Sequence, residues 1–576
     1  MKKLNIAVIS GGSGNDSLIN GIRNLYPKAS IKVIVNAYDS GKSTGICRKV
    51  TDTLGVSDIR KNHIRMYKTN KFINKNIVEF YDGRYNFTKG KEKEEIKNKL
   101  SELKLSNLNS VIDEFFSNET AYDYEYNDFS IANIVYSQMY KMFGYEYTNN
   151  LFSNMLGLDD FVILNSFDNI YINAHLENGT VLEDEGDIVR LDNPNNKIVK
   201  LDYIGKQEHG LNKKAIDEVN NADLIIISTG TFWSSIYPTL EYLDFYKYIN
   251  KAKAKKIWAI NSKEDHDAFG VSSNDYISIV EKLGLDLSQF TILENLDAVK
   301  SLKQKNNNYK IVYKHMENNN GKHNSHKFAS AILSIYYGLE NSNKYNKFIF
   351  DFDDTLWARD ADKNTHLYSI SLENLDLVKK FIDNSIIISG NSLSHVIEKI
   401  NIYNKVKDTD FNINICADAN TSFYKQSDKN ITAAQELVIK DWKYIYNWLK
   451  NTYGIEAVPT KNNLDEVTCL KIKPLTQLER LTLNELINKK IKSDKLNLKS
   501  EITGKTTIDI LNKNNSKGFI FKYLKLDSYT TLYIGDEVNN GNDKDIAKMC
   551  NFSINVNDVE DTNLILKLLD FNREAN

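Results

Sequence analysis

The segment Lys347–Leu356, with the sequence KFIFDFDDTL, constrains the fold more than any other part of this chain. Apolar side chains surround Asp351, and a second acid, Asp353, follows two positions later. A short apolar run that ends in an acid predicts a buried strand that delivers carboxylates to the C-terminal edge of a sheet. Two carboxylates at this spacing can hold one Mg²⁺ and can divide the work of nucleophile and general acid/base. The alternative is a strand followed by an ordinary Asp-rich turn.

Three later segments carry complementary chemistry in a fixed order. The stretch SIIISG predicts a second strand that ends in Ser389, whose hydroxyl can bind a phosphate oxygen. Lys517 opens an amphipathic helix, and an ammonium beside a helix N-terminus neutralises an anion. The stretch TLYIGDEVNNGND predicts a third strand, followed by a Gly/Asn turn that carries Asp536 and Asp543.

This order of motifs, Asp-x-Asp-x-Thr, Ser, Lys and Gly-Asp…Asn-Asp, resembles the haloacid dehalogenase-like (HAD) phosphatase superfamily from about residue 345 to 576. The resemblance implies a Rossmann-like core and a Mg²⁺-dependent phosphomonoesterase that acts on a sugar phosphate or related small metabolite. The catalytic residues that it implies are Asp351, Asp353, Ser389 and Lys517. The metal ligands that it implies are Asp351, Asp353, Asp536 and Asp543.

The long interval between Ser389 and Lys517 predicts a cap domain at about residues 418–505, of the α/β type found in sugar-phosphate phosphatases and phosphomannomutases. A phosphomutase therefore stays open as an alternative. Within the cap, Lys471 and Lys473 alternate on a predicted strand, where they could reach a distal anion of a substrate or form an exposed strand face, which is slightly preferred. The segment Thr503–Leu511 predicts a strand that returns to the core. One departure from many relatives is Asn391 in place of Arg.

The N-terminal part begins with the predicted strand LNIAVIS, followed at once by Gly11, Gly12, Ser13 and Gly14 and then by a helix. A strand, a glycine turn and a helix expose backbone N–H groups to a phosphate, although a tight structural turn explains the same residues.

A second predicted strand, IKVIVNA, precedes Asp39, the small donors Ser43 and Thr44, and the cation Arg48. Asp58 and Arg60 follow as an acid–base cluster, for which a satisfied ion pair is the alternative.

These segments resemble the 2-phospho-L-lactate transferase (CofD-like) family and its gluconeogenesis-factor relatives, which bind UDP-N-acetylglucosamine, over roughly residues 1–335. The resemblance implies a Rossmann-like parallel sheet that binds a nucleotide-linked ligand. The candidate ligand-binding residues are Gly11, Gly12, Ser13, Gly14, Asp39, Ser43, Thr44, Arg48, Asp58, Arg60, Asn133, Thr229, Gly230, Thr231 and Ser234.

Two departures leave the chemistry of this half open. Ser40 replaces the second acid of the family's Asp-Asp pair, and Phe129 occupies the place of a His. One hypothesis is a bifunctional enzyme that joins a CofD-like phosphotransferase, using a nucleotide-activated donor, to the phosphatase. The other is a sensor of sugar nucleotides fused to the phosphatase.

Composition sets the remaining expectations. A length of 576 residues predicts more than one domain. The domains expected are α/β: a CofD-like domain at 1–337, a linker at 338–346 and a HAD-like domain at 347–576. A net charge of −2 predicts no nucleic-acid partner, and the short apolar runs predict no membrane segment and a cytoplasmic protein. The expected partners are a phosphorylated small molecule and a nucleotide-linked ligand, with a homodimer implied by analogy.

Overall fold

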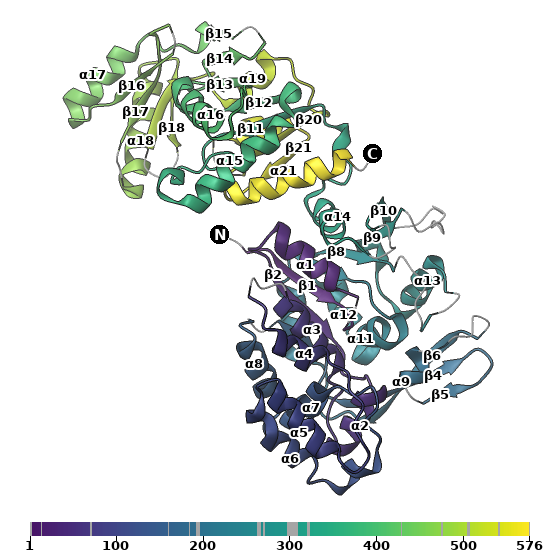
Figure 1. Cartoon of the computed structure of the whole chain (residues 1–576). Coiled ribbons are helices and arrows are strands. Elements are labelled where there is room, and N and C mark those ends of the chain that lie inside the picture. The colour runs from purple at the N-terminus through teal and green to yellow at the C-terminus, as the bar shows by residue number, and fades with distance from the viewer. Residues whose placement is uncertain are drawn as a thin grey trace. The chain divides into compact units, whose positions relative to one another are not determined.

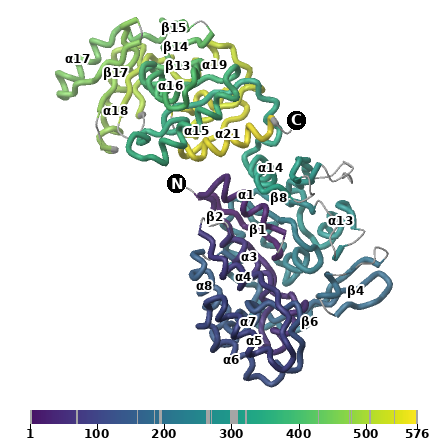
Figure 2. The backbone as a smooth tube through the Cα atoms, in the orientation of Figure 1, coloured from purple at the N-terminus to yellow at the C-terminus, as the bar shows by residue number. Residues whose placement is uncertain are grey.

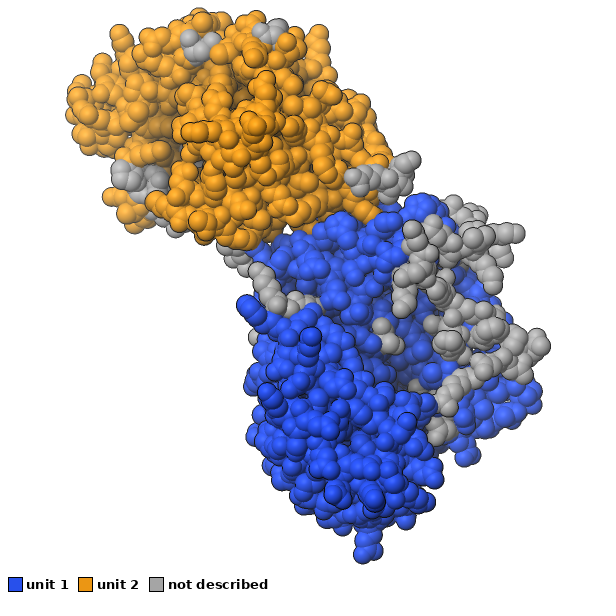
Figure 3. Space-filling model, in the orientation of Figure 1, with its two compact units in different colours: residues 1–340 blue, residues 341–576 orange. Residues whose placement is uncertain are grey.

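The computed structural model describes residues 3–12, 14–68, 72–158, 161–183, 185–189, 191, 196–261, 267–268, 271–296, 309–318, 323–427, 429–462, 464–473, 476–503, 507–539 and 542–574. The chain divides into two compact units, residues 1–340 and 341–576 (Figure 3). The division falls within the predicted linker at 338–346. Among the described residues, no helix is both long enough and apolar enough to cross a bilayer.

The first unit is built on a seven-stranded sheet in which every neighbouring pair is parallel (Figure 1). Its central strand, Leu224–Ile227, is apolar and buried throughout, as expected for a parallel sheet covered by helices. In spatial order the strands are β10 (Lys310–Lys314), β9 (Phe290–Asn295), β8 (Lys255–Ala259), β7 (Leu224–Ile227), β1 (Asn5–Ile9), β2 (Ser30–Val35) and β3 (Val162–Leu164).

Helices cover this sheet, and a helical insertion separates β2 from β3 (Figure 2). The helices before β3 are α1 (Asp16–Leu25), α2 (Lys42–Thr51), α3 (Ser57–Lys68), α4 (Lys75–Asp82), α5 (Glu92–Glu102), α6 (Asn109–Phe115), α7 (Ile131–Phe143) and α8 (Tyr145–Met155). Those after it are α9 (Glu185–Val189), α10 (Lys213–Asn221), α11 (Tyr237–Glu241), α12 (Tyr246–Lys251), α13 (Ser273–Leu283) and α14 (Ser325–Tyr337). A small antiparallel sheet contains β5 (Val181–Leu182), β4 (Asn169–Leu176) and β6 (Ile198–Lys206).

The second unit has its own seven-stranded sheet, parallel except at one edge. Its strands in spatial order are β15 (Asn430–Ala433), β14 (Ser422–Lys425), β13 (Asn414–Ala417), β12 (Ser385–Ile388), β11 (Lys347–Asp351), β20 (Thr531–Gly535) and β21 (Phe552–Asn555). Because β12, β11 and β20 are adjacent and parallel, the residues that follow them meet at one sheet edge. The helices of this core are α15 (Thr365–Lys379), α16 (Leu393–Lys407), α19 (Lys517–Tyr523), α20 (Lys544–Met549) and α21 (Val559–Glu574).

The cap is a four-stranded antiparallel sheet with two helices, α17 (Trp442–Tyr453) and α18 (Gln477–Ser493). Its strands in spatial order are β16 (Val458–Lys461), β17 (Val467–Ile472), β19 (Thr507–Asn512) and β18 (Leu498–Thr503).

Two expectations about the cap are corrected. The strands β14 and β15, placed in the cap from sequence, extend the core sheet instead. The predicted strand Thr503–Leu511 does not return to the core, because β19 pairs with both β17 and β18 of the cap. The side chains of Ile508 and Ile510 are buried with Leu449 and Ile487 in the cap's apolar core, and this burial holds β19 there.

Candidate functional site

Three acids meet at the C-terminal edge of the core sheet in the second unit. Asp351 is the last residue of β11, Asp536 follows β20, and Asp543 precedes α20. One carboxylate oxygen from each lies within 4.8 Å of the others. Asp351 and Asp543 are buried and Asp536 is half-buried, so these charges are only weakly solvated. A set of hard oxygen donors this close together fits a divalent cation such as Mg²⁺.

Lys517 supplies the positive charge that holds this cluster together. It is the first residue of α19, and its buried Nζ lies 2.6 Å from Oδ1 of Asp351 and also bonds Asp543. Burial alone would lower the pKa of Lys517, but the two carboxylates outweigh it and raise that pKa above its ordinary value. The lysine is therefore an ammonium at neutral pH.

One ammonium does not neutralise three carboxylates. Burial raises the pKa of Asp351 well above its ordinary value, and repulsion from Asp543 and Asp536 adds to this effect against the attraction of Lys517. Burial and repulsion from Asp543 likewise raise the pKa of Asp536 to about 6. This excess of negative charge is what a divalent cation would relieve.

Asp353 faces a different set of partners. Its Oδ2 accepts hydrogen bonds from Ser389 Oγ and Asn391 Nδ2, both at 2.9 Å. His395, in the first turn of α16, has its Nε2 3.6 Å from Oδ1. Burial raises the pKa of Asp353, but the neighbouring His395 and the hydrogen bond from Ser389 outweigh it and lower the pKa overall. The Asp353 side chain is thus outside the three-carboxylate group, which leaves its main chain for any metal contact.

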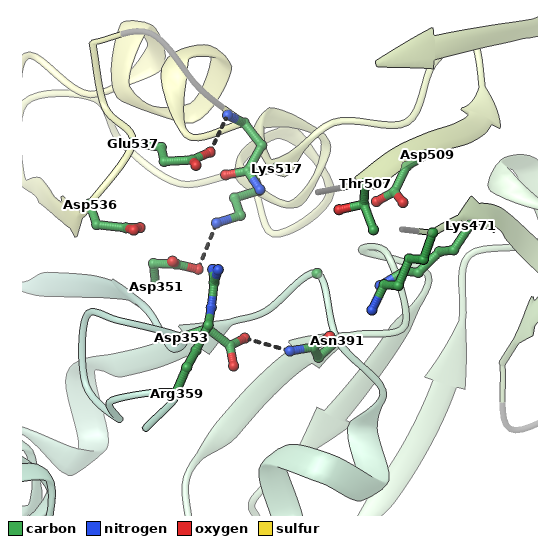
Figure 4. Close-up of a pocket in the computed structure, with 13 residues that line it drawn as sticks. Asp351, Asp353, Arg359, Asn391, Lys471, Thr507, Asp509, Lys517, Asp536 and Glu537 are labelled. Carbon is green, nitrogen blue, oxygen red and sulfur yellow. Dashed lines mark hydrogen bonds and ion pairs between the residues drawn. The ribbon is translucent and has the colours of Figure 1, made fainter. Parts of the chain in front are cut away.

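A cavity of about 330 Å³ opens beside Asp351, Asp353 and Asp536 (Figure 4). Its wall combines the core residues with side chains from the cap strands and from the loop after β11. The contributions from outside the predicted catalytic and metal-binding residues are Arg359, Gly390, Asn391, Lys471, Lys473, Thr507, Asp509, Glu537 and Asn542. Lys471 and Lys473, for which an exposed strand face was slightly preferred, both line this cavity, Lys471 half-buried and Lys473 exposed.

In the first unit, a second cavity of about 330 Å³ lies beside the carboxyl ends of β1, β2 and β7. Its walls come from the glycine turn after β1, the loop after β2, and the N-terminal ends of α2 and α3. The sequence-predicted residues that line it are Gly11, Gly12, Asp39, Ser43, Thr44, Asp58, Thr231 and Ser234.

Six predicted ligand-binding residues do not line this cavity, and Ser13 lies outside the described residues. The six are Gly14, Arg48, Arg60, Asn133, Thr229 and Gly230. Thr229 and Gly230 face inward, because the Thr229 hydroxyl donates to the Gly14 carbonyl at 2.6 Å and the Gly230 N–H donates to the Asn261 side chain at 3.1 Å.

The two arginines are buried structural groups. Arg48 donates to the Asn169 side chain and to the Ile170 carbonyl, both at 2.7 Å, and its guanidinium stacks 3.8 Å from the Tyr171 ring centroid. Arg60 does not pair with Asp58. Its Nε donates to Asn133 Oδ1 at 2.8 Å, and burial lowers its pKa to about 10.

Asn133 links Arg60 to the cavity wall by hydrogen bonds. Its Nδ2 donates to the hydroxyls of Ser43 and Thr44 at 2.9 and 3.1 Å. Arg60 and Asn133 therefore orient two wall hydroxyls from behind rather than touching a ligand.

Sequence reasoning missed several cavity groups, above all its cations. Lys61 lies 3.7 Å from Asp58, Lys42 pairs with Asp128 at 2.6 Å, and Arg84 Nη1 donates to the Ser43 hydroxyl at 3.2 Å. Lys42 and Lys61 adjoin the predicted residues Ser43 and Arg60 in sequence but were not among them, and Arg84 comes from the helical insertion, which carries no motif. Ser235 also lines the cavity. The wall carries three cations and three carboxylates, Asp39, Asp58 and Asp128, together with several hydroxyls and four glycines. The hydroxyls, the glycine backbone and Arg84 suit a phosphate-bearing ligand.

Phe129, in the place of the family's His, is completely buried, and its ring centroid lies 4.6 Å from that of Tyr126. It does not line the cavity.

The fold and these two sites define a protein of two Rossmann-like α/β units, of which the second has a HAD-like core, motif order and cap. The chain belongs to the 2-phospho-L-lactate transferase CofD family, whose model matches residues 6–332.

Among curated relatives, the putative gluconeogenesis factor of Aquifex aeolicus is 23% identical over 265 residues, which cover 45% of this chain and 68% of that protein. The putative gluconeogenesis factor of Thermoanaerobacterium thermosulfurigenes is 22% identical over 291 residues, covering 50% and 77%.

Among solved structures, a member of the UPF0052 family from Bacillus halodurans covers 58% of this chain and 99% of its own, with 19% identity and a TM-score of 0.45. A haloacid dehalogenase-like hydrolase from Bacteroides thetaiotaomicron covers 38% of this chain and 98% of its own, with 12% identity and a TM-score of 0.29.

Proposed function

We propose that the second unit is a Mg²⁺-dependent phosphatase that acts on a small phosphomonoester. The observation that carries this proposal is the buried Asp351, held by Lys517 and flanked by Asp536 and Asp543 on the wall of a polar cavity. A cation bound by these three carboxylates would offset the repulsion between a phosphate dianion and an anionic nucleophile.

In the first step, Asp351 attacks phosphorus in line, and the bond from phosphorus to the ester oxygen breaks. Lys517 lies beside Asp351 and neutralises charge on the transferring group, and Asp353 gives a proton to the departing alkoxide. In the second step, water attacks the aspartyl phosphate, Asp353 accepts the water's proton, and Asp351 is released with inorganic phosphate.

The hydrogen bonds from Ser389 and Asn391 suit Asp353 to this double role. In the free protein they hold its carboxylate anionic and point it at one position. The arrival of a phosphate dianion raises the pKa of a nearby carboxyl, which favours the protonated form needed for the first step. Once the alcohol has left with that proton, the anionic form is restored and can accept a proton from water.

The test is Asp351→Asn, which keeps the shape of the side chain and removes its nucleophilic charge. Turnover of p-nitrophenyl phosphate with Mg²⁺ should fall by at least about 10³-fold while the circular dichroism spectrum is unchanged. Asp360→Asn, at an exposed position in the same loop region, is the matched control and should keep its activity. Turnover retained by Asp351→Asn would overturn the assignment.

For the first unit, we infer a CofD-like phosphotransferase domain that binds a nucleotide-linked ligand, so that the chain is bifunctional. The glycine turn, the wall hydroxyls and Arg84 support a phosphate-bearing ligand, and Lys42 and Lys61 balance the wall carboxylates Asp128 and Asp58. A sensor domain is the second candidate, and the buried Phe129 favours it, because a transferase that used a His at this place would lack it here.

Thermal unfolding of the full chain with UDP-N-acetylglucosamine tests the inferred ligand class. A rise in melting temperature that is lost in Lys61→Ala supports binding at this cavity. Incubation with a phospho-acid acceptor, followed by product analysis, then separates the two candidates: a new phosphodiester identifies a transferase, and binding without turnover identifies a sensor.

A further inference from the structure

Two lysines of the cap lie on the wall of the phosphatase cavity. Lys471 belongs to β17, and Lys473 follows directly after that strand. Residues two apart on a strand project from the same face, so the two ammonium groups are presented together. Both line the cavity that contains Asp351, and Figure 4 shows the side chain of Lys471 entering it from the cap, on the opposite side from Asp351.

These lysines differ from the other cations of the cavity. Arg359 pairs with Asp354, with Nε 3.2 Å from Oδ2, and Lys517 is held by Asp351 and Asp543. Within the described part of the chain, neither Lys471 nor Lys473 forms an ion pair. Asp509, opposite Lys471 in the β17–β19 register, contributes one negative charge to the same wall. The cap wall therefore carries two ammonium groups against one carboxylate.

We propose that Lys471 and Lys473 form a subsite for a second anionic group of the substrate. The second unit then acts on small phosphomonoesters that also carry a carboxylate or another phosphate. This inference rests on the proposed phosphatase function and narrows its substrate class.

The positions of the cations indicate which anionic group of the substrate each one binds. Lys517 lies beside the nucleophile and serves the phosphoryl group that is transferred, whereas the cap lysines face the distal part of the cavity. An anion that enters a confined polar site loses hydration, and an ammonium donor restores its interactions. The cavity of about 330 Å³ admits a small metabolite that spans both ends.

The experiment compares kcat/KM within two matched substrate pairs. Glycerol 3-phosphate and 3-phosphoglycerate differ by a carboxylate, and glucose 6-phosphate and glucose 1,6-bisphosphate differ by a phosphate. Wild-type protein should prefer the doubly anionic member of at least one pair by about 10- to 100-fold, the range expected for a hydrogen bond between charged groups. A preference confined to one pair identifies the anion and supports the subsite.

In the Lys471→Ala/Lys473→Ala double variant, the ratio within that pair should fall to about one, and in Lys473→Glu it should fall at least as far. Lys473→Glu changes an exposed side chain beyond the end of the strand, which guards against misfolding of the double variant. Lys489→Ala, at an exposed position on α18, is the matched control and should keep the wild-type ratio.

Different results would overturn the subsite and the phosphatase activity. Wild-type protein that hydrolyses the singly anionic members equally well, or variants that keep the wild-type ratio, would overturn the subsite alone. Wild-type protein that hydrolyses none of the four esters, nor p-nitrophenyl phosphate, would overturn the phosphatase proposal itself.

Discussion

At the scale of single residues, the chemistry of the second unit depends on partners that hold two aspartates in different states. Asp351 is buried among other carboxylates and next to one lysine, whereas Asp353 accepts hydrogen bonds from neutral side chains. Ser389 was predicted as a phosphate ligand, but in this structure its hydroxyl donates to Asp353. The same residue therefore also positions the acid/base group.

If Asp353 protonates the leaving group, the loss of activity on its removal should depend on how readily that group leaves without a proton. In Asp353→Asn, kcat/KM should fall at least about 10-fold more for glycerol 3-phosphate than for p-nitrophenyl phosphate. The nitrophenolate leaves readily without a proton, whereas the alkoxide does not, and kcat/KM reports the step that forms the aspartyl phosphate. Steady-state kinetics with both esters measures this, and equal losses would contradict the assignment.

A second residue-scale prediction concerns His63 in the first unit. Its ring is fully buried, with Nδ1 2.7 Å from the Tyr136 hydroxyl and Nε2 3.1 Å from the Ser153 hydroxyl, and burial lowers its pKa to about 3. Between pH 3 and 6.5 the unfolded chain therefore binds a proton at His63 that the folded chain does not. Stability is fully present above pH 6.5 and falls as the pH drops through this window.

From pH 7 to pH 5, His63 should thus remove about 2 kcal/mol from the free energy of unfolding. Urea unfolding of the full chain at both pH values measures the loss, which should be smaller by this amount in His63→Gln. His326→Gln, at an exposed position, is the control and should behave like the wild type. An unchanged pH dependence in His63→Gln would show that the imidazole is protonated equally in both states.

At the scale of elements, strand ends and helix contacts position the sites. In the first unit, α1 follows the glycine turn directly and packs against α14. This approach is close at Gly21, where an added Cβ would lie 1.9 Å from the Ser325 carbonyl oxygen. Both partners are helix backbone, so the contact cannot relax by rotating a side chain.

Gly21→Ala should therefore destabilise the first unit by about 1–3 kcal/mol, despite the better helix propensity of Ala. A lower melting temperature of the full chain, with a smaller ligand-induced shift, is the expected result. Asn24→Ala, at an exposed position on the same helix, should leave the melting temperature nearly unchanged. Wild-type stability in Gly21→Ala would mean that the two helices can separate at no cost.

At the scale of the whole molecule, one chain carries two sites of similar size in separate compact units. Only the second-unit site is rich in carboxylates that converge on one point within the described residues. The two sites should therefore respond differently to removal of divalent ions.

Treatment with EDTA should abolish hydrolysis of p-nitrophenyl phosphate, and added Mg²⁺ should restore it. The circular dichroism spectrum should be unchanged, because the cation holds substrate rather than a fold element. Asp536→Asn should need more Mg²⁺ for half-maximal activity than the wild type. Full activity in EDTA would exclude a role for a divalent ion in turnover.

The sequence alone was enough to predict the two-unit α/β architecture, which the structure confirms, and the resemblance to the CofD family, which the family model confirms. The strands that end in Asp351, Ser389 and Gly535-Asp536 could be recognised from a few consecutive residues. Each is a short apolar run, which predicts a buried strand, followed directly by a polar residue, which marks the strand's C-terminal end. The three strands lie side by side and are parallel, so the polar residues at their C-terminal ends meet at one edge of the sheet.

Only the tertiary structure decided which charged side chains face a cavity. Arg48 and Arg60 are next to the right motifs but satisfy buried carbonyl and amide oxygens, whereas Arg84, from an insertion without a motif, reaches the cavity wall. The inward direction of Lys471 and the contact of His395 with Asp353 likewise depend on segments far apart in sequence. The physical reason is that strand and helix periodicity is set by near neighbours, whereas the partner of a long charged side chain is set by whichever distant element packs against it.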